Sequence, residues 1–252
     1  MAEDLSHATG KPLTDLVTDA LIDYIKKNKL RPGDRLPNEY ELADILGVGR
    51  STVREGVRAL VSRNVLEIRR GAGTFVSEKQ GVADDPLGLM FYEDQFQMAA
   101  DLLQIRELIE PAIAAYAASH ATPEQIRNIL DLCQKVEDKI RRGEDHLPDD
   151  ILFHTAIARS SGNQVVGTLI PIINRSVDVF CNLTGRILRE ETIATHREVA
   201  DAIARRDPKG AHDGMYLHLL YNRRALKAAD LKRQKQDEDG QVCDGEQSGQ
   251  IV

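Results

Sequence analysis

An arginine-bearing helix followed at once by two short apolar strands is the feature that most constrains this chain. The helix is expected to begin within Gly49–Ser51 and to end near Asn64. Apolar residues recur there at helical spacing, at Val53, Val57, Leu60 and Val61. Arginines fall at four-residue steps on the other face, at Arg50, Arg54 and Arg58. One face is therefore expected to pack on a core while the other carries positive charge into solvent.

Two further helices are predicted before this one, over 14–28 and 38–46. The segment between them, LRPGDRLP, contains prolines and a glycine that prevent helix continuation. Asn38 can cap the second helix, Glu41 can complete a capping box with it, and Gly47 ends it. The result is three short helices in close succession.

Two strands are predicted after the arginine-bearing helix, over 66–69 and 74–76, on either side of a glycine-bearing tip. This order is typical of a helix-turn-helix followed by a β-wing. We assign residues 1–76 to this domain.

Positive charge is concentrated in the same region. The chain has a net charge of −7, but residues 1–80 carry +1 and the remainder −8. Six arginines and two glutamates lie between Arg50 and Arg70. A charged helix face alone is usually only solvated. Because the stripe, the turn, the wing and the charge asymmetry occur together, we expect binding to double-stranded DNA.

A helix that reads the major groove presents its first turns to base edges and phosphates. The candidate contacts on the helix are Arg50, Ser51, Thr52, Arg54 and Arg58. Arg70, Gly71 and Gly73 form a wing tip thin enough to enter a minor groove. Arg35, just before the second helix, is a candidate phosphate clamp.

Beyond a predicted linker over 77–92, residues 93–230 read as helical throughout. The expected helices are 98–120, 122–142, 150–160, 164–189, 191–205 and 207–229. We expect Pro111 to kink or interrupt the first of them. The polar residues 231–252 are predicted to form a disordered tail. The fold class is therefore mostly α, with an N-terminal winged helix-turn-helix and an all-α C-terminal helical bundle.

Composition excludes several other classes of protein. With 42% hydrophobic and 29% charged residues, the chain is expected to be globular rather than disordered. No apolar run approaches the roughly 18 residues that cross a bilayer, and the start of the chain does not resemble a signal peptide. We therefore expect a cytoplasmic protein without membrane association. The three cysteines are too far apart to indicate a disulfide framework or a metal knuckle.

The segment RLPNEYELADILGVGRSTVREGVRALVSRNVLEIRRGAGTFV resembles the signature of the GntR family of regulators. It contains L-P-x-E-x-x-L-A, G-V-x-R-x-T-V-R-E and R-x-G-x-G-T-F-V. The resemblance places Arg50, Arg54 and the wing tip on the DNA-contact positions of that family. Tyr40 replaces an arginine that many members carry, and Gly49 replaces a hydroxyl residue. These departures bear on the operator sequence rather than on DNA binding itself.

Three of the seven histidines lie inside predicted helices of the second domain, at His154, His196 and His218. Asp150 precedes the first of them by four residues, so one helix face presents a carboxylate and an imidazole together. Three imidazoles and a carboxylate suit Zn²⁺ or a similar divalent ion. Widely separated histidines are more often surface or hydrogen-bonded core residues, so spacing alone leaves both interpretations open.

The second domain is similar to the FCD-type C-terminal domain of the FadR subgroup. The similar segments are DILFHTAIARSSGN, THREVADAIARRD and MYLHL. In the metal-binding branch of that subgroup the ligands match Asp150, His154, His196 and His218. The resemblance therefore implies a bound divalent metal ion, expected to be Zn²⁺. Arg106 resembles a position that points into the same cavity. It is expected either to bind a carboxylate effector or to form a salt bridge with Glu107 or Glu110.

The sequence thus predicts a homodimeric transcription regulator, expected to be a repressor, that binds an inverted-repeat operator. A small organic acid, such as a sugar acid or hydroxy acid, would bind at the metal and change DNA affinity. One alternative is a metal-free regulator with an apolar or acyl effector. Another is a metal-dependent enzyme, although no general base, nucleophile motif or cofactor fingerprint is apparent.

Overall fold

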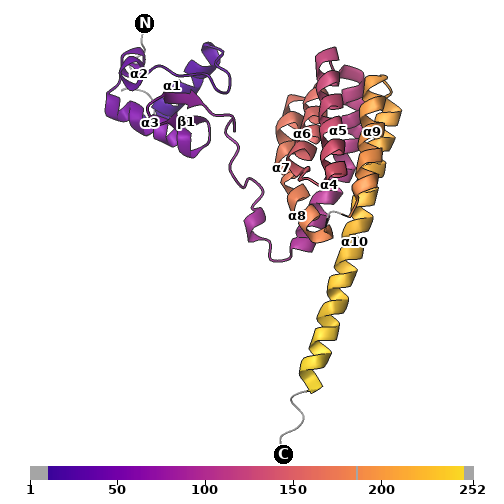
Figure 1. Cartoon of the computed structure of the whole chain (residues 1–252). Helices are drawn as coiled ribbons and strands as arrows, with labels where there is room; N and C mark the ends of the chain where they lie inside the picture. Colours follow the sequence, from indigo (N-terminus) through magenta and orange to yellow (C-terminus); the bar gives the residue numbers. More distant parts are fainter. Residues whose placement is uncertain (1–10, 186, 247–252) are drawn as a thin grey trace, which may run out of the picture. The chain divides into compact units, whose positions relative to one another are not determined.

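The computed structural model describes residues 11–185 and 187–246, with two compact units divided after Met90 (Figure 1). Within the described ranges, no helix is both long enough and apolar enough to cross a membrane.

The first unit is the predicted winged helix-turn-helix. It contains three helices and a two-stranded sheet: α1 (Leu13–Lys27), α2 (Glu39–Leu46), α3 (Arg50–Ser62), β1 (Leu66–Arg69) and β2 (Gly73–Val76). Their apolar faces meet in one core that includes Val17, Leu21, Leu42, Val53, Val57, Leu60 and Leu66. The amphipathic pattern of the sequence therefore produces the packing expected from it.

The bounds of α2 follow from its capping residues. The Asn38 side chain accepts hydrogen bonds from the backbone N–H groups of Tyr40 and Glu41, and the Glu41 carboxylate accepts from the N–H of Asn38. At the other end, Gly47 adopts a left-handed conformation with φ of 67°. The predicted capping box and glycine stop are both confirmed.

The wing is an antiparallel hairpin in which Leu66 pairs with Val76 and Arg69 pairs with Gly73. The turn before α2 adds to its edge, since the N–H of Leu36 donates to the carbonyl of Thr74 at 2.9 Å. The hairpin is therefore fixed to the helix-turn-helix by backbone hydrogen bonds as well as by its buried residues.

The segment predicted as a linker contains a short 3₁₀-helix, η2 (Leu89–Phe91), that the sequence pattern did not predict. Met90 and Phe91 are 76% and 82% exposed. The N–H groups of Leu89 and Met90 donate to the Asp85 carboxylate, which defines this turn.

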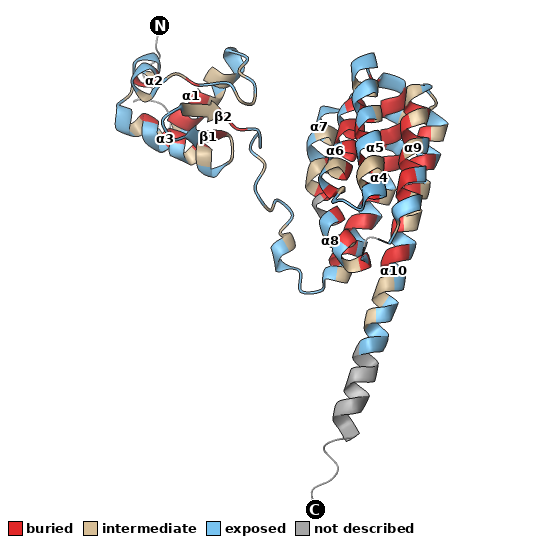
Figure 2. Cartoon of the chain, in the orientation of Figure 1, coloured by how far each residue is buried: buried red, intermediate tan, exposed pale blue. Residues whose placement is uncertain are grey.

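The second unit is all helical over its described residues. Its helices are α4 (Gln95–His120), α5 (Pro123–Arg142), α6 (Leu147–Ser160), α7 (Gln164–Ile173), α8 (Arg175–Thr184), α9 (Arg189–Ala204) and α10 (Pro208–Glu246). Helix α10 packs mainly on α4 and α9, and α6 lies between α4, α5 and α7. Figure 2 shows the buried residues on the faces that these helices turn toward one another.

Two helix predictions need correction. Pro111 neither ends nor divides α4, which continues to His120. The single helix expected over 164–189 is instead α7 and α8, with a break at the buried Asn174. The N–H of Asn174 still donates to the carbonyl of Ile170 at 2.8 Å, so α7 closes in a regular turn before α8 begins.

The predicted disordered tail also needs correction. Helix α10 does not end near Ala229 but continues to Glu246, while residues 247–252 lie outside the described residues. Contacts in the first two turns after Ala229 explain why the helix continues. Arg233 forms ion pairs with Asp94 and Asp230, and its guanidinium lies over the Phe96 ring at 4.5 Å. The polar composition of the segment indicated disorder, but it contains no proline that would stop a helix.

The close contact between α1 and α3 gives a stability prediction. A Cβ on Gly56 would lie 2.7 Å from Cγ1 of Val17. Gly56→Ala should therefore destabilise the first unit by about 1–3 kcal/mol through overpacking, despite the better helix propensity of alanine. Amide hydrogen exchange in α1 and α3 would measure this. Ala59→Gly, on the same helix, is the control for propensity and should cost about 0.5–1 kcal/mol. Slower exchange in Gly56→Ala would contradict the packing argument.

Candidate DNA-binding surface and metal centre

The arginines of α3 lie on its solvent side, as predicted: Arg50, Arg54 and Arg58 are all exposed. Ser51 is exposed and Thr52 is half-buried in the same first turn. Helix α3 is therefore anchored by its apolar face and presents a continuous polar face.

Two residues at the start of α2 contact the arginines of α3. The Glu39 carboxylate accepts hydrogen bonds from Nε and Nη2 of Arg54, the latter at 2.7 Å. The hydrogen bond from Arg54 holds the pKa of Glu39 below its ordinary value, against the opposing effect of partial burial. The guanidinium carbon of Arg50 lies 4.3 Å from the centre of the Tyr40 ring. Both arginines are thus oriented by contacts within the protein.

The wing brings Arg35 and Gly73 together. Gly73 has φ of 120°, and a Cβ there would lie 2.9 Å from Nε of Arg35. Arg70 and Gly71 are exposed at the tip, where Gly71 has φ of 76°. Glycine is favoured at both positions for its backbone conformation, and at position 73 the end of the Arg35 side chain also packs where a Cβ would stand.

The structure brings the three predicted histidine ligands into one cluster. His154 of α6, His196 of α9 and His218 of α10 are all buried, and one nitrogen from each lies within 4.8 Å of the other two. The carboxylate of the buried Asp150 borders the cluster. Its Oδ1 lies 3.5 Å from Nε2 of His196, and its Oδ2 lies 4.0 Å from Nε2 of His154.

Neighbouring groups orient two of the rings. Nδ1 of His154 lies 2.7 Å from Oε2 of Glu110, so this nitrogen donates a hydrogen bond to the carboxylate. Nδ1 of His218 lies 3.1 Å from Oγ1 of Thr195, and that hydroxyl donates to the carbonyl of Glu191. Nδ1 of His218 is therefore the donor. Nε2 of His154 is left with its lone pair, whereas Nε2 of His218 accepts a hydrogen bond from Nδ2 of Asn222 at 3.2 Å.

These atoms fit a divalent cation. Nε2 of His154 and both nitrogens of His196 are buried and have no hydrogen-bond partner among the described residues. Burial, and then the neighbouring His154, lower the pKa of His196 well below its ordinary value; burial and the other two rings do the same for His218. Both rings are accordingly neutral near pH 7, as metal ligands must be. Three imidazole nitrogens and one carboxylate form a donor set that suits Zn²⁺ and similar ions.

Arg106 is 2% exposed and makes the predicted salt bridge with Glu110 rather than with Glu107. Its Nε donates to Oε1 of Glu110 at 2.6 Å, whereas its buried Nη2 has no partner among the described residues. Burial would raise the pKa of Glu110, but Arg106 and His154 outweigh this and hold it far below its ordinary value. Glu110 is therefore an anion shared by an arginine and a histidine.

Sequence reasoning missed three residues of this centre. Glu110 was considered only as a partner of Arg106, and its contact with His154 joins residues 44 apart in the chain. Thr195 and Asn222 were not identified; Nδ2 of the buried Asn222 lies 3.2 Å from Nε2 of His218. Asn222 follows His218 by four residues and therefore lies on the same helix face. This spacing was the one sequence signal that could have placed Asn222 near the cluster.

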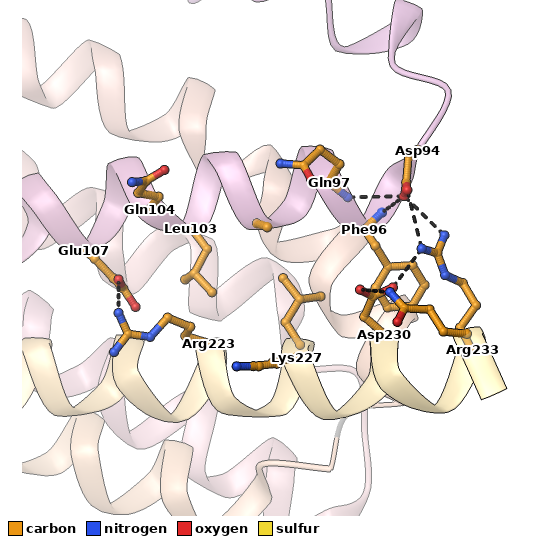
Figure 3. Close-up of a pocket in the computed structure, with 13 residues that line it drawn as sticks. Asp94, Phe96, Gln97, Leu103, Gln104, Glu107, Arg223, Lys227, Asp230 and Arg233 are labelled. Atoms are coloured by element: carbon orange, nitrogen blue, oxygen red, sulfur yellow. Dashed lines mark hydrogen bonds and ion pairs between the residues drawn. The ribbon is translucent and has the colours of Figure 1, made fainter.

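A groove of about 520 Å³ lies between the first half of α4 and α10, away from the histidines (Figure 3). An ion pair between Arg223 and Glu107 closes one end, at 2.9 Å, and the pair of Arg233 and Asp94 closes the other. None of the predicted site residues lines this groove.

A second surface of this unit is apolar. Large side chains on one side of α4 and on α7 are exposed: Ile105, Leu108, Tyr116, Val165 and Leu169. A shallow groove runs between these helices, lined by Leu108, Ala112, Tyr116, Val166 and Leu169 among others. We refer to the residues in these two lists as the α4–α7 face.

Comparisons with known proteins agree with this architecture. Residues 13–76 match the family described as bacterial regulatory proteins, gntR family, and residues 101–221 match the FCD domain. The chain is 31% identical over 236 residues to the HTH-type transcriptional regulator YcbG of Bacillus subtilis strain 168, covering 91% of this chain and 98% of the relative. It is 27% identical over 226 residues to the HTH-type transcriptional repressor NanR of Salmonella newport, covering 83% of each.

A solved structure supports the same assignment. That of Streptococcus agalactiae GntR superposes with a TM-score of 0.76 at 39% identity, covering 84% of this chain and 99% of the other. The named relatives are transcription regulators rather than enzymes. The FCD domain is an effector domain of the metal-binding type, in keeping with the histidine cluster. The chain therefore belongs to the GntR family, as a DNA-binding transcription regulator with a small-molecule effector domain of the FCD type.

Proposed function

We propose that this regulator is a homodimeric repressor whose operator affinity is lowered by a small carboxylate bound beside a Zn²⁺ ion. Asp150, His154, His196 and His218 would hold the ion. The observation that carries the effector part is the buried Nη2 of Arg106, a charged donor without a partner among the described residues.

The ligand chemistry argues for the ion. His154 and His196 have buried ring nitrogens without partners among the described residues, which is costly in a helical core unless a hydrogen-bond donor or a cation engages them. When bound, the ion supplies positive charge and an open coordination position for a ligand oxygen. Glu110 orients His154, and Thr195 orients His218, so the donor set is ordered by outer contacts of the kind that tune metal affinity.

The same centre favours an anionic effector over an apolar one. Nε of Arg106 is engaged by Glu110, which leaves Nη2 free to donate to a carboxylate. Nδ2 of Asn222 lies 3.2 Å from Nε2 of His218, and an ion bound to that nitrogen would release the amide for a ligand hydroxyl. A sugar acid or hydroxy acid satisfies both groups, whereas an acyl chain would leave Nη2 of Arg106 buried without a partner.

Removing one histidine tests the metal. His196→Ala should lower zinc affinity, because a direct ligand is lost. The loss should exceed the roughly 10- to 100-fold that substitutions of outer-shell residues cause. Zinc affinity would be measured by competition with a chromogenic chelator on the full chain.

The control is His212→Ala, which removes an exposed histidine from α10 and should leave zinc affinity unchanged. Equal zinc affinity of His196→Ala and the parent would refute this ligand. A parent whose thermal melt is indifferent to chelator would favour the metal-free alternative.

We propose that α3 lies in the major groove of the operator and that the wing tip enters the neighbouring minor groove. The regulator would bind these chromosomal sites in the cytoplasm. Arg50, Ser51, Thr52, Arg54 and Arg58 would contact bases and phosphates, with Arg70, Gly71 and Gly73 at the minor groove and Arg35 at a phosphate. Two-fold symmetry of the dimer then requires an inverted-repeat operator.

Arg54→Ala tests this surface. Loss of a bidentate arginine–guanine contact should weaken operator binding by about 1–3 kcal/mol, roughly 5- to 150-fold, with a smaller effect on unrelated duplex. Fluorescence anisotropy with a duplex selected from a random library would measure both. Arg127→Ala, an exposed arginine of α5, is the matched control. Operator affinity within twofold of the parent would exclude Arg54 as a base contact.

We propose the α4–α7 face as the dimer interface. Its exposed residues on α4 recur along one side of the helix, and Leu108 and Val165 are 69% and 73% exposed. A contiguous apolar patch of this kind marks an interaction site, and a second copy would cover it.

A charge placed on this face should separate the protomers. Leu108→Asp is expected to shift the dimer toward monomer at micromolar concentration, because the carboxylate would be buried without a partner. Sedimentation velocity would show the shift. Leu152→Asp replaces another exposed leucine (51%), on α6 and outside the α4–α7 face, and should leave the dimer intact. An unchanged dimer in Leu108→Asp would place the interface elsewhere.

A further inference from the structure

Tyr40 is a large aromatic residue on the surface beside α3, and it does not belong to the core. It is 64% exposed, and its ring contacts Arg50, the first residue of α3. An exposed aromatic side chain stacked on an arginine at a DNA-binding surface calls for an explanation beyond folding.

The backbone around Tyr40 is fixed. Its N–H donates to the Asn38 side chain at 3.0 Å within the capping box, and its helix is held to α3 by core residues. The ring therefore leaves α2 from a defined position. Its neighbour Glu39 binds Arg54 from the same turn, so consecutive residues of α2 orient two arginines of α3.

The two contacts differ in what they leave available. Glu39 occupies Nε and Nη2 of Arg54 with hydrogen bonds. The guanidinium carbon of Arg50 lies over the Tyr40 ring, and within the described residues this guanidinium makes no hydrogen bond or ion pair. The cation–π contact thus restrains Arg50 without a hydrogen bond, and its N–H donors remain available for the O6 and N7 of a guanine.

We propose that Tyr40 is a specificity-determining residue that orients Arg50 for one base position of each operator half-site. Without the ring, Arg50 reaches the neighbouring phosphates as readily as a base edge, and it keeps its electrostatic contribution while losing discrimination. This inference depends on the proposed placement of α3 in the major groove, but it does not depend on the metal, the effector or repression.

The experiment compares Tyr40→Ala, which removes the ring, with Tyr40→Phe, which keeps it. The probes are a duplex selected from a random library with the full-length parent, its single-base variants and an unrelated duplex. We expect Tyr40→Ala to lose about 5- to 10-fold discrimination at one symmetric base position. Affinity for unrelated duplex and the dependence on salt should stay within twofold of the parent. Tyr40→Phe should retain the parental preferences.

Arg50→Ala completes the design. It should lose preference at the same position, and adding Tyr40→Ala to it should have no further effect there. The proposal is overturned by unchanged base preferences in Tyr40→Ala, by an equal loss on operator and unrelated duplex, by a Tyr40→Phe variant that behaves like Tyr40→Ala, or by a Tyr40→Ala effect that persists without Arg50. If Arg50→Ala itself leaves all preferences unchanged, the proposed placement of α3 fails instead.

Discussion

The buried carboxylate of Glu110 organises the centre of the helical unit. Glu110 is 3% exposed and accepts one hydrogen bond from Arg106 and one from His154. A charge in such a position is stable only when its partners are held in place, and those partners come from α4 and α6. The ring of His154 then faces His196 and His218. The packing of α6, α9 and α10 is therefore constrained by contacts between these polar groups as well as by the apolar core.

Much of this could be predicted from the sequence because the signals are local. The cap at Asn38, the glycine stop at Gly47 and the apolar face of α3 depend on residues a few positions apart. The approach of His154, His196 and His218 depends on tertiary packing, and spacing alone could not distinguish ligands from ordinary core histidines; the resemblance to a family supplied that set. Glu110 and Thr195 lacked any local signal, since their contacts with the histidines join different helices.

The errors at helix ends have physical causes. Pro111 lies in a helix packed on several others, and tertiary contacts outweigh the local cost of a proline. The break at Asn174 was missed because the apolar pattern continues through it. The extension of α10 was missed because composition does not reveal that Arg233 reaches Asp94 and Phe96 on another helix.

The single helix α10 contributes residues to two separate sites of the domain. His218 belongs to the histidine cluster, and Arg233 closes the groove at the start of α4. Fifteen residues of helix separate them, about 22 Å at 1.5 Å per residue. A helix resists compression and twist along its axis, so a small rotation of α10 at His218 moves Arg233 by a similar angle. The ion pair between Arg233 and Asp94 therefore links the residue that caps α4 to the helix that carries His218.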